Sequence, residues 1–315
     1  MWALAGVAAL GGVVAAVAVQ TLGSTPGPCP GYGGSQPESH EAATVDFDAA
    51  VPAFSHAFII VLENEEAESV LTSKDATYLQ GLQADGALLK NFYGICHPSL
   101  PNYLAMIGGD TFGVHSDCTG CLQDASTIID GIEATGRTWK AYMEGMPSAC
   151  FTGGQSGKYY QKHNPFIYFK AIRENPARCA RTVPYTQFAT DRAAGVLPDY
   201  VWITPDICND AHDCGIGQAD RWLRGVVPMI TTSQAFKEGG VLFITFDEGD
   251  SKLGCCGNAA GGRIFTLVLS PLVKPGSVSE LEYSHYSLLK TVATAWGFPA
   301  PGKAAAVAPI QGIWR

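Results

Sequence analysis

Two apolar runs in this chain each end in a pair of residues with side-chain oxygens. One run directly precedes Glu63 and Asn64, and the other directly precedes Asp247 and Glu248. Such runs are typical of buried parallel strands, whose carboxyl ends meet at one edge of an α/β sheet and border its ligand crevice. Oxygen ligands gathered at that edge predict a cation-binding site.

A hydroxyl group follows another expected strand, residues 88–93. Ser99 stands between Pro98 and Pro101, where we expect a strand to give way to a helix. A helix starting there would direct amide groups and its positive dipole end towards an anion near the hydroxyl, which suits Ser99 to attack phosphorus. The alternative is that Ser99 only caps the helix. Asn102 is a further candidate for lining the site.

The expected strand 199–204 leads into an acidic loop, residues 205–214, which contains three aspartates, one asparagine and one histidine. Carboxylates serve hard cations, imidazole serves zinc-like ions, and His212 could instead protonate a leaving alkoxide. Asp210 lies beside it. Local turn formation by Asx side chains is the competing explanation for some of these residues.

His285 lies at the start of the expected helix 285–296, where it either supports the site or caps the helix. His56, His115 and His163 do not stand in a comparable motif. We interpret His56 as structural and leave His163 outside the predicted site, while His115 is a weaker candidate for lining it.

Metal-assisted hydrolysis explains the whole set better than a metal-free reaction. A divalent cation lowers the pKa of a neighbouring hydroxyl and neutralises charge on phosphoryl oxygens, so Ser99 needs no separate Ser-His-Asp relay.

The order and spacing of these motifs resemble the bacterial phosphoesterase family that includes acid phosphatases and phosphatidylcholine-type phospholipases C, itself related to the alkaline phosphatase superfamily. The motifs that carry the resemblance are Val61–Asn64, His97–Tyr103, Cys208–Asp213, Phe246–Asp250 and Ser284–Leu289.

The resemblance implies an α/β fold, an alkaline-phosphatase-like three-layer sandwich with a mostly parallel central sheet. It implies a divalent metal ion of unspecified identity. The implied ligands are Glu63, Asn64, Ser99, Asp247 and Glu248. Because Asp247-Glu248 stands where two-metal relatives have Asp-His, we expect one metal ion rather than two.

The resemblance also implies that Ser99 is the nucleophile and that His212 assists the leaving group or the phosphoryl group. Residues expected to contact substrate or support the site are Asn102, Asp210, Arg263 and His285. Lys252 is a weaker candidate for a phosphate contact.

The expected activity is phosphoric ester hydrolysis through a phosphoserine intermediate, with acid phosphatase (phosphomonoesterase) activity favoured. Phospholipase C or phosphodiesterase activity at the same site is the first alternative, and a non-catalytic, metal-stabilised surface protein is the second. Sulfatase activity is disfavoured because Ser99-Leu100-Pro101 lacks the arginine of the sulfatase motif.

Composition agrees with one large domain. The chain has 315 residues, 47% of them hydrophobic, and a net charge of -9 with only 20 Lys and Arg. That balance gives no reason to expect nucleic-acid binding, which needs clustered cations. The expected partner is a small phosphate ester or a phospholipid head group, and no protein partner is predicted.

The predicted organisation has three parts. Residues 1–24 are apolar and read as a signal peptide or an N-terminal membrane anchor, and residues 25–51 as a flexible linker. Residues 52–315 form the phosphoesterase domain. An aromatic-rich insertion near residues 145–182 either covers the site or forms a peripheral aromatic core. The protein is expected to be extracytoplasmic, either secreted or anchored.

Ten cysteines fit an oxidising compartment. We expect disulfides between Cys118 and Cys121, Cys150 and Cys179, and Cys208 and Cys214. The alternative is a zinc cluster of Cys118, Cys121, Cys255 and Cys256.

Expected strands and helices alternate along the domain, as in βαβ units. Besides those already named, the strands are residues 138–143 and 263–270, and the helices are residues 78–85, 126–135 and 220–233.

Overall fold

The two apolar runs lie side by side in the middle of one sheet. In the computed structural model, which describes residues 51–256 and 259–315, they form β1 (Ala57–Leu62) and β8 (Val241–Phe246). Every residue of both strands is buried. The strands pair in parallel, with Leu62 opposite Phe246. The residues that follow them therefore emerge next to each other.

The central sheet has the strand order β11-β2-β10-β8-β1-β7-β3-β6, with β9 pairing on β2. Only the pairings of β10 and β9 are antiparallel among these strands, so the other strands all end at the same edge. Their bounds are β2 (Ala87–Tyr93), β3 (Trp139–Met143), β6 (Thr182–Pro184), β7 (Tyr200–Thr204), β9 (Arg263–Ile264), β10 (Thr266–Leu269) and β11 (Ser277–Ser284).

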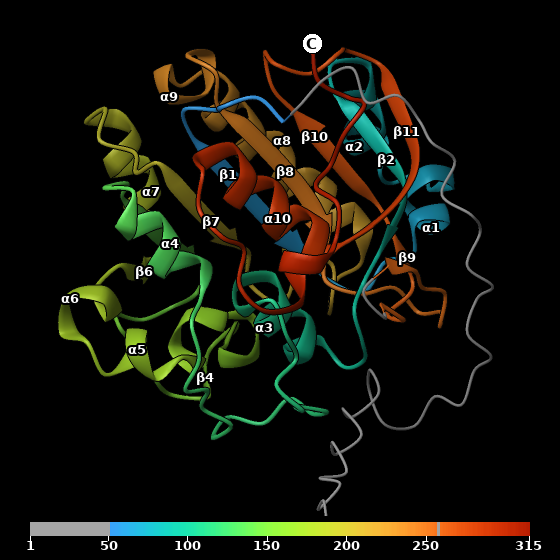
Figure 1. The fold of residues 1–315 in the computed structure, drawn as a ribbon. Coiled ribbons are helices and arrows are strands. Elements are labelled where there is room, and N and C mark those ends of the chain that lie inside the picture. Colours follow the sequence, from blue (N-terminus) through green and yellow to red (C-terminus); the bar gives the residue numbers. More distant parts are fainter. Residues whose placement is uncertain (1–50, 257–258) are drawn as a thin grey trace, which may run out of the picture.

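Helices cover both faces of the sheet (Figure 1). On one face α10 (His285–Trp296) packs on α3 (Ser99–Gly108) and α4 (Ile128–Ala134), and it crosses in front of β1 and β8 in the view. On the other face α8 (Ile216–Thr231) packs on α2 (Thr77–Gly81). The predicted three-layer sandwich is confirmed. The remaining helices are α1 (Ala67–Thr72), α5 (Lys170–Arg173), α6 (Pro176–Cys179), α7 (Thr186–Ala193), α9 (Gln234–Lys237), η1 (Leu82–Ala84), η2 (Gln161–His163), η3 (Pro165–Tyr168) and η5 (Gly302–Ala306).

Three sequence-based predictions of elements need correction. The expected strand 263–270 is two short strands, β9 and β10, because the chain pairs first with β2 and then moves between β2 and β8. The expected helix 78–85 is α2 followed by η1. The edge strand β11 was not predicted, because its alternation of polar and apolar residues leaves it half exposed rather than uniformly apolar.

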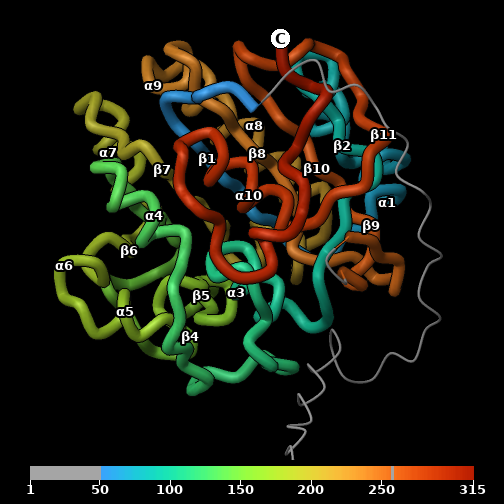
Figure 2. The backbone as a smooth tube through the Cα atoms, in the orientation of Figure 1, coloured from blue at the N-terminus to red at the C-terminus, as the bar shows by residue number. Residues whose placement is uncertain are grey.

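The segment between β3 and β6 is closed by a disulfide and lies beside α3. Cys150 and Cys179 are bonded, 29 residues apart, and the segment contains the small hairpin β4 (Gln155–Ser156) and β5 (Tyr159–Tyr160). Figure 2 shows its helices α5 and α6 below α4 and β6. Phe166 from this segment stacks on Trp139 of β3 at 5.3 Å between ring centroids, so its aromatic residues join the core.

The other expected disulfides are also present. Cys118 pairs with Cys121 and Cys208 with Cys214. The alternative zinc cluster is wrong, because Cys255 pairs with Cys256.

The predicted leader or anchor, residues 1–24, lies outside the described residues, as does all of the predicted linker except Val51. Among the described residues, no helix is both long and apolar enough to cross a membrane.

The Cys150–Cys179 disulfide closes the longest loop of the described disulfides, and we expect it to stabilise the fold the most. In the loop-entropy description, removing it with Cys150→Ser/Cys179→Ser lowers the free energy of unfolding by about 3–4 kcal/mol. Cys118→Ser/Cys121→Ser, which opens a loop of only 3 residues' separation, should cost about 2 kcal/mol. Guanidinium unfolding of both variants measures the difference, and an equal or reversed order would contradict it.

Candidate active site

The ends of β1 and β8 hold each other through backbone and side-chain hydrogen bonds. The Asp247 amide donates to the Leu62 carbonyl at 2.9 Å, and the Asn64 amide donates to Asp247 Oδ1 at 3.1 Å. Asn64 adopts a left-handed backbone (φ 56°) that asparagine tolerates better than most residues. Glu63 and Asp247 are fully buried. The predicted pair of acidic strand ends is thus one site.

The Ser99 hydroxyl reaches this site. Ser99 is the first residue of α3, and its Oγ donates to Glu63 Oε2 at 3.0 Å. The N-cap position is Pro98, which makes no side-chain cap. The hydroxyl is therefore directed at a buried carboxylate, and the alternative that Ser99 serves as the helix N-cap is wrong.

Asn102 fixes the loop that leads to Ser99. Its Oδ1 accepts from the amides of Ile95 and Cys96 at 2.7 and 3.0 Å, and its Nδ2 donates to the Cys96 carbonyl at 2.7 Å. The same Nδ2 lies 3.3 Å from Glu248 Oε2. Asn102 thus ties the loop before α3 to the end of β8.

Glu248 turns towards His97, which lies two residues before Ser99. Glu248 Oε2 lies 2.8 Å from His97 Nδ1. That hydrogen bond raises the pKa of His97, while burial raises the pKa of Glu248 to about 7. Glu248 therefore has a histidine partner of its own, His97.

His163 lies between two acids, although the sequence analysis left it outside the site. Its Nε2 is 3.3 Å from Glu63 Oε2 and its Nδ1 is 3.3 Å from Asp210 Oδ2. Its ring stacks on Tyr103 at 5.4 Å, and Tyr103 Oη donates to Glu63 Oε1. Burial keeps the pKa of His163 well below its usual value, so the ring is neutral. A neutral imidazole is the form that binds metal.

The donor set fits a cation. One ligand atom from each of Glu63, His163 and Asp210 lies within 4.8 Å of the others. Among the described residues, Asp210 Oδ2, Asp247 Oδ2 and His163 Nε2 are buried without a hydrogen-bond partner. Burial and mutual repulsion raise the pKa of Glu63, and burial also raises that of Asp247. Buried acids with orphaned oxygens are compensated well by a divalent ion.

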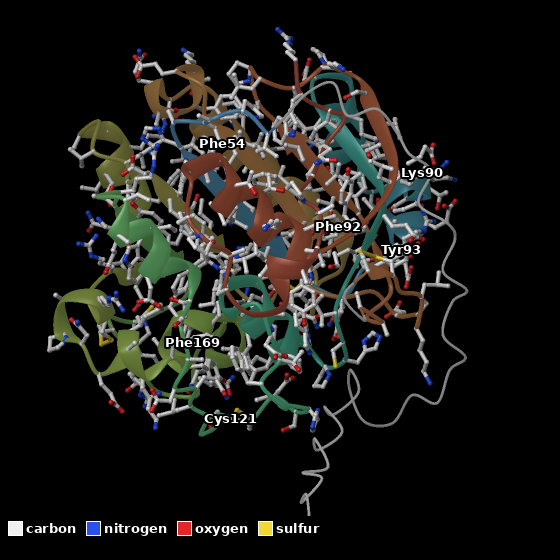
Figure 3. All side chains as sticks on the ribbon, in the orientation of Figure 1. Phe54, Lys90, Phe92, Tyr93, Cys121 and Phe169 are labelled. Carbon is white, nitrogen blue, oxygen red and sulfur yellow. A yellow bond between two sulfur atoms is a disulfide. The ribbon has the colours of Figure 1, made fainter. Side chains whose placement is uncertain are left out.

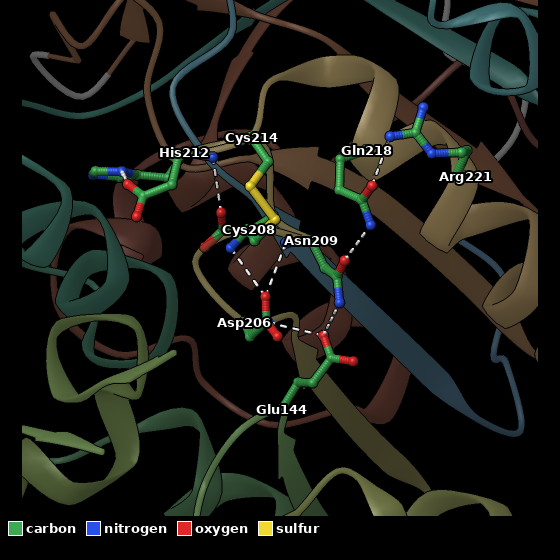
Figure 4. Close-up of a disulfide and its surroundings, with 10 residues drawn as sticks. Glu144, Asp206, Cys208, Asn209, His212, Cys214, Gln218 and Arg221 are labelled. Atoms are coloured by element: carbon green, nitrogen blue, oxygen red, sulfur yellow. Dashed lines mark hydrogen bonds and ion pairs between the residues drawn. A yellow bond between two sulfur atoms is a disulfide. The ribbon is translucent and has the colours of Figure 1, made fainter. Parts of the chain in front are cut away.

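The acidic loop after β7 is clamped by Cys208–Cys214 and by Asx-type turns (Figure 4). Asp206 Oδ1 accepts from the amides of Cys208 and Asn209 at 3.0 Å each. Glu144, which follows β3, accepts from the Asp206 amide and from Asn209 Nδ2, both at 2.9 Å. Asp206 and Asn209 thus shape the loop.

The same loop also positions Asp210 and His212 at the site. Asp210 Oδ1 accepts from the His212 amide at 2.8 Å, and the Glu63 amide donates to the Asp210 carbonyl at 2.8 Å. His212 Nδ1 is 2.8 Å from Asp213 Oδ1, and its ring lies 6.0 Å from that of His163. His212 is partly exposed, at the outer side of the buried acids.

His285 contacts the backbone of Asp247 at the site. Its Nε2 donates to the Asp247 carbonyl at 2.6 Å, and burial lowers its pKa to about 4, so the ring is neutral. Phe92 of β2, labelled in Figure 3, packs edge-on against it at 5.6 Å. The structure does not bring Arg263 to these residues, because its guanidinium contacts the Lys90 carbonyl and Glu68.

The residues that the sequence analysis missed come from segments with no acidic motif. His163 and Lys162 lie in the disulfide-closed aromatic segment, and Tyr103 lies one turn after Ser99. The one usable signal is the crowding of aromatic residues between Cys150 and Cys179, which is compatible with a segment over the site and equally with a peripheral aromatic core.

Comparisons with known proteins identify the family of the chain. A sequence model of the Phosphoesterase family matches residues 55–299. The chain belongs to the Phosphoesterase family.

Proteins similar in sequence to this Phosphoesterase-family chain include phosphatases from two fungi and one bacterium. An acid phosphatase from Aspergillus fumigatus is 30% identical over 262 residues, 80% of this chain and 57% of the relative. A phosphate-repressible acid phosphatase from Penicillium chrysogenum is 32% identical, over 80% of this chain and 61% of the relative. The chain thus spans only about 60% of these fungal proteins. A phosphatidylinositol-3-phosphatase from Mycobacterium tuberculosis is 30% identical over 84% of this chain and 85% of the relative.

Solved structures show the same fold at low sequence identity. An alkaline phosphatase superfamily protein from Vibrio parahaemolyticus aligns with a TM-score of 0.55 at 12% identity, over 82% of this chain and 71% of that protein. A phosphonate monoester hydrolase from Silicibacter pomeroyi aligns with a TM-score of 0.53 at 12% identity, over 81% and 76%. The Phosphoesterase-family domain therefore has an alkaline-phosphatase-like fold.

Repulsion among the buried acids predicts a stabilising substitution in metal-free protein. Burial raises the pKa of Asp210 to about 8, against about 3.9 in an unfolded chain. A carboxyl whose pKa is higher in the folded state makes the free energy of unfolding fall as pH rises between those two values. Asp210→Asn keeps an oxygen for the His212 amide and removes the charge.

We expect Asp210→Asn to raise the free energy of unfolding at about pH 8 by on the order of 1–3 kcal/mol, and to leave it nearly unchanged at about pH 4. Denaturant unfolding with a chelator measures this, with exposed Asp85→Asn as the control. Parallel pH profiles for wild type and Asp210→Asn would contradict the prediction.

Proposed function

We propose that this protein hydrolyses phosphate esters through a phosphoserine intermediate, with Ser99 as the nucleophile. The observation that carries the proposal is the 3.0 Å hydrogen bond from Ser99 Oγ to Glu63 Oε2 at the start of α3. A hydroxyl that donates to a buried carboxylate has an acceptor ready for its proton. The names of the relatives, acid phosphatases among them, support the same reaction class.

The residues best placed to hold a divalent cation are Glu63, His163 and Asp210. Asn64, Ser99 and Asp247 lie against Glu63 and complete the proposed ligand set, while the contacts of Glu248 with His97 and Asn102 favour a supporting role for it. When bound, the cation would supply positive charge that stabilises an ionised Ser99 hydroxyl and the phosphoryl oxygens. We propose a single ion, because the described residues that could hold a cation form one group, Glu63, His163 and Asp210.

The reaction divides into two displacements at phosphorus. In the first, Ser99 Oγ forms a bond to phosphorus, its proton passes to Glu63, and the bond from phosphorus to the leaving oxygen breaks. His212, held at Nδ1 by Asp213 and partly exposed, is placed to protonate that leaving oxygen. In the second, water passes a proton to His212 and forms a bond to phosphorus, the bond to Ser99 Oγ breaks, Ser99 Oγ recovers its proton from Glu63, and inorganic phosphate leaves.

The substrates we propose are phosphomonoesters, as small molecules or on phospholipid head groups. The Mycobacterium tuberculosis relative, of which the chain covers 85%, is named a phosphatidylinositol-3-phosphatase. A phosphodiesterase or phospholipase C using the same site is the alternative. An extracytoplasmic location is part of the proposal and is supported by the disulfides of the domain.

Ser99→Ala tests the nucleophile. With added divalent metal we expect kcat for p-nitrophenyl phosphate to fall by at least about 10³-fold, as for other deletions of a nucleophile. Exposed Ser148→Ala is the matched control and should retain full activity. A wild-type protein that hydrolyses neither p-nitrophenyl phosphate, nor its bis ester, nor phosphatidylcholine overturns the proposed activity, whereas an active Ser99→Ala overturns only the assignment of Ser99.

The metal site is tested by binding rather than by activity. We expect His163→Ala to weaken Zn²⁺ or Mn²⁺ binding by at least about tenfold, because it removes a buried nitrogen from between Glu63 and Asp210. Isothermal titration of chelator-treated, dialysed protein measures this, and exposed His115→Ala should bind as wild type does. Equal affinity in His163→Ala would remove His163 from the ligand set.

A further inference from the structure

Lys162 is a cation held at the rim of the acidic site by two polar contacts. Its Nζ lies 3.0 Å from Asp117 Oδ2 and 3.4 Å from His212 Nε2. Only 15% of its side chain is exposed. An ammonium group has three N–H donors, and within the described part of the chain no third acceptor lies on it. One donor therefore remains for a ligand while His212 Nε2 accepts from Lys162, and a second becomes available when His212 carries on Nε2 the proton for the leaving oxygen.

The contacts of Asp117 link that ammonium group to the residue that follows Ser99. Asp117 Oδ1 accepts from the amide of Leu100 at 3.0 Å, and Leu100 directly follows Ser99. One carboxylate therefore joins the first turn of α3 to Lys162. The other neighbour, His212, lies beside His163. Lys162 thus borders the space outside Ser99 on the side of the disulfide-closed segment.

The positive charge of Lys162 acts on the buried acids. It opposes the rise in pKa of both Glu63 and Asp210. Burial lowers the pKa of Lys162, but the charges of Glu63 and Asp117 outweigh that effect and raise it. The ammonium group is charged at neutral pH.

We propose that Lys162 binds a non-bridging oxygen of the substrate phosphoryl group and sets a preference for phosphomonoesters over phosphodiesters, a role that rests on the proposed function. A monoester carries nearly two negative charges near pH 7, whereas a diester carries one and has a second ester group in place of one charged oxygen. A cation beside the nucleophile therefore favours the monoester. Arg263, the sequence-based candidate for this contact, is bound to Glu68 instead.

The test compares Lys162→Gln, Lys162→Arg and the control Lys158→Gln, an exposed lysine of the same segment. The substrates are p-nitrophenyl phosphate and bis(p-nitrophenyl) phosphate, assayed with the same metal. For Lys162→Gln we expect kcat/KM to fall about tenfold or more for the monoester and less than about threefold for the diester. Lys162→Arg should restore most of the monoester rate, and Lys158→Gln should match wild type.

Inhibition by inorganic phosphate gives a second readout, because the product presents the same oxygens. We expect its inhibition constant, measured against the diester, to rise about tenfold in Lys162→Gln. An equal loss on both esters, or an unchanged ester ratio and phosphate inhibition, would overturn the role of Lys162 while leaving the proposed hydrolysis intact. A wild-type protein inactive on both esters would overturn the proposed function and this inference with it.

Discussion

The parallel pairing of β1 with β8 is the constraint on which the site depends. It brings Glu63 and Asp247 to the same sheet edge, and the Asn64 amide then binds Asp247 Oδ1. A shift of one residue in this register would turn the side chains of either strand to the opposite face and separate the two acids. Six buried residues on each strand, all of them apolar except Thr245, hold the register. Burial of the apolar side chains of β1 and β8 therefore positions the acids Glu63 and Asp247.

The same arrangement concentrates like charges in a buried space. Glu63, Asp210 and Asp247 are all buried, and one carboxylate oxygen each of Asp210 and Asp247 has no hydrogen-bond partner. Repulsion of this kind costs stability and is typical of sites built to hold a cation or a transferred group. The rings of His163 and His285 contact these acids without adding charge, because burial lowers the pKa of both rings and keeps them neutral.

Much of this arrangement could be predicted from the sequence, because it is encoded locally. Strands β1 and β8 are uninterrupted apolar runs, and α10 begins at His285 after a serine cap, so their bounds follow from residue type alone. Glu63 and Asp247 directly follow these strands, so their positions follow from those of β1 and β8. The edge strand β11 was missed, because it alternates polar and apolar residues.

The position of His163 could not be predicted in this way, because it depends on contacts between distant segments. The Cys150–Cys179 disulfide and the stacking of Phe166 on Trp139 bring its short helix against α3. The expected position of Arg263 near the site differs from the observed one for a related reason. A strand break at Phe265 places it on β9, where it pairs with Glu68 rather than with the site.

The central claim is that Ser99, held against Glu63 by the β1 and β8 ends, becomes covalently phosphorylated during turnover. Acid quenching of metal-loaded protein during hydrolysis of p-nitrophenyl phosphate, followed by peptide mass spectrometry, tests it most directly. The account predicts one added phosphoryl group on the peptide that contains Ser99, absent before substrate is added. Turnover with no modified serine, or with the phosphoryl group on His163 or His212, would contradict it.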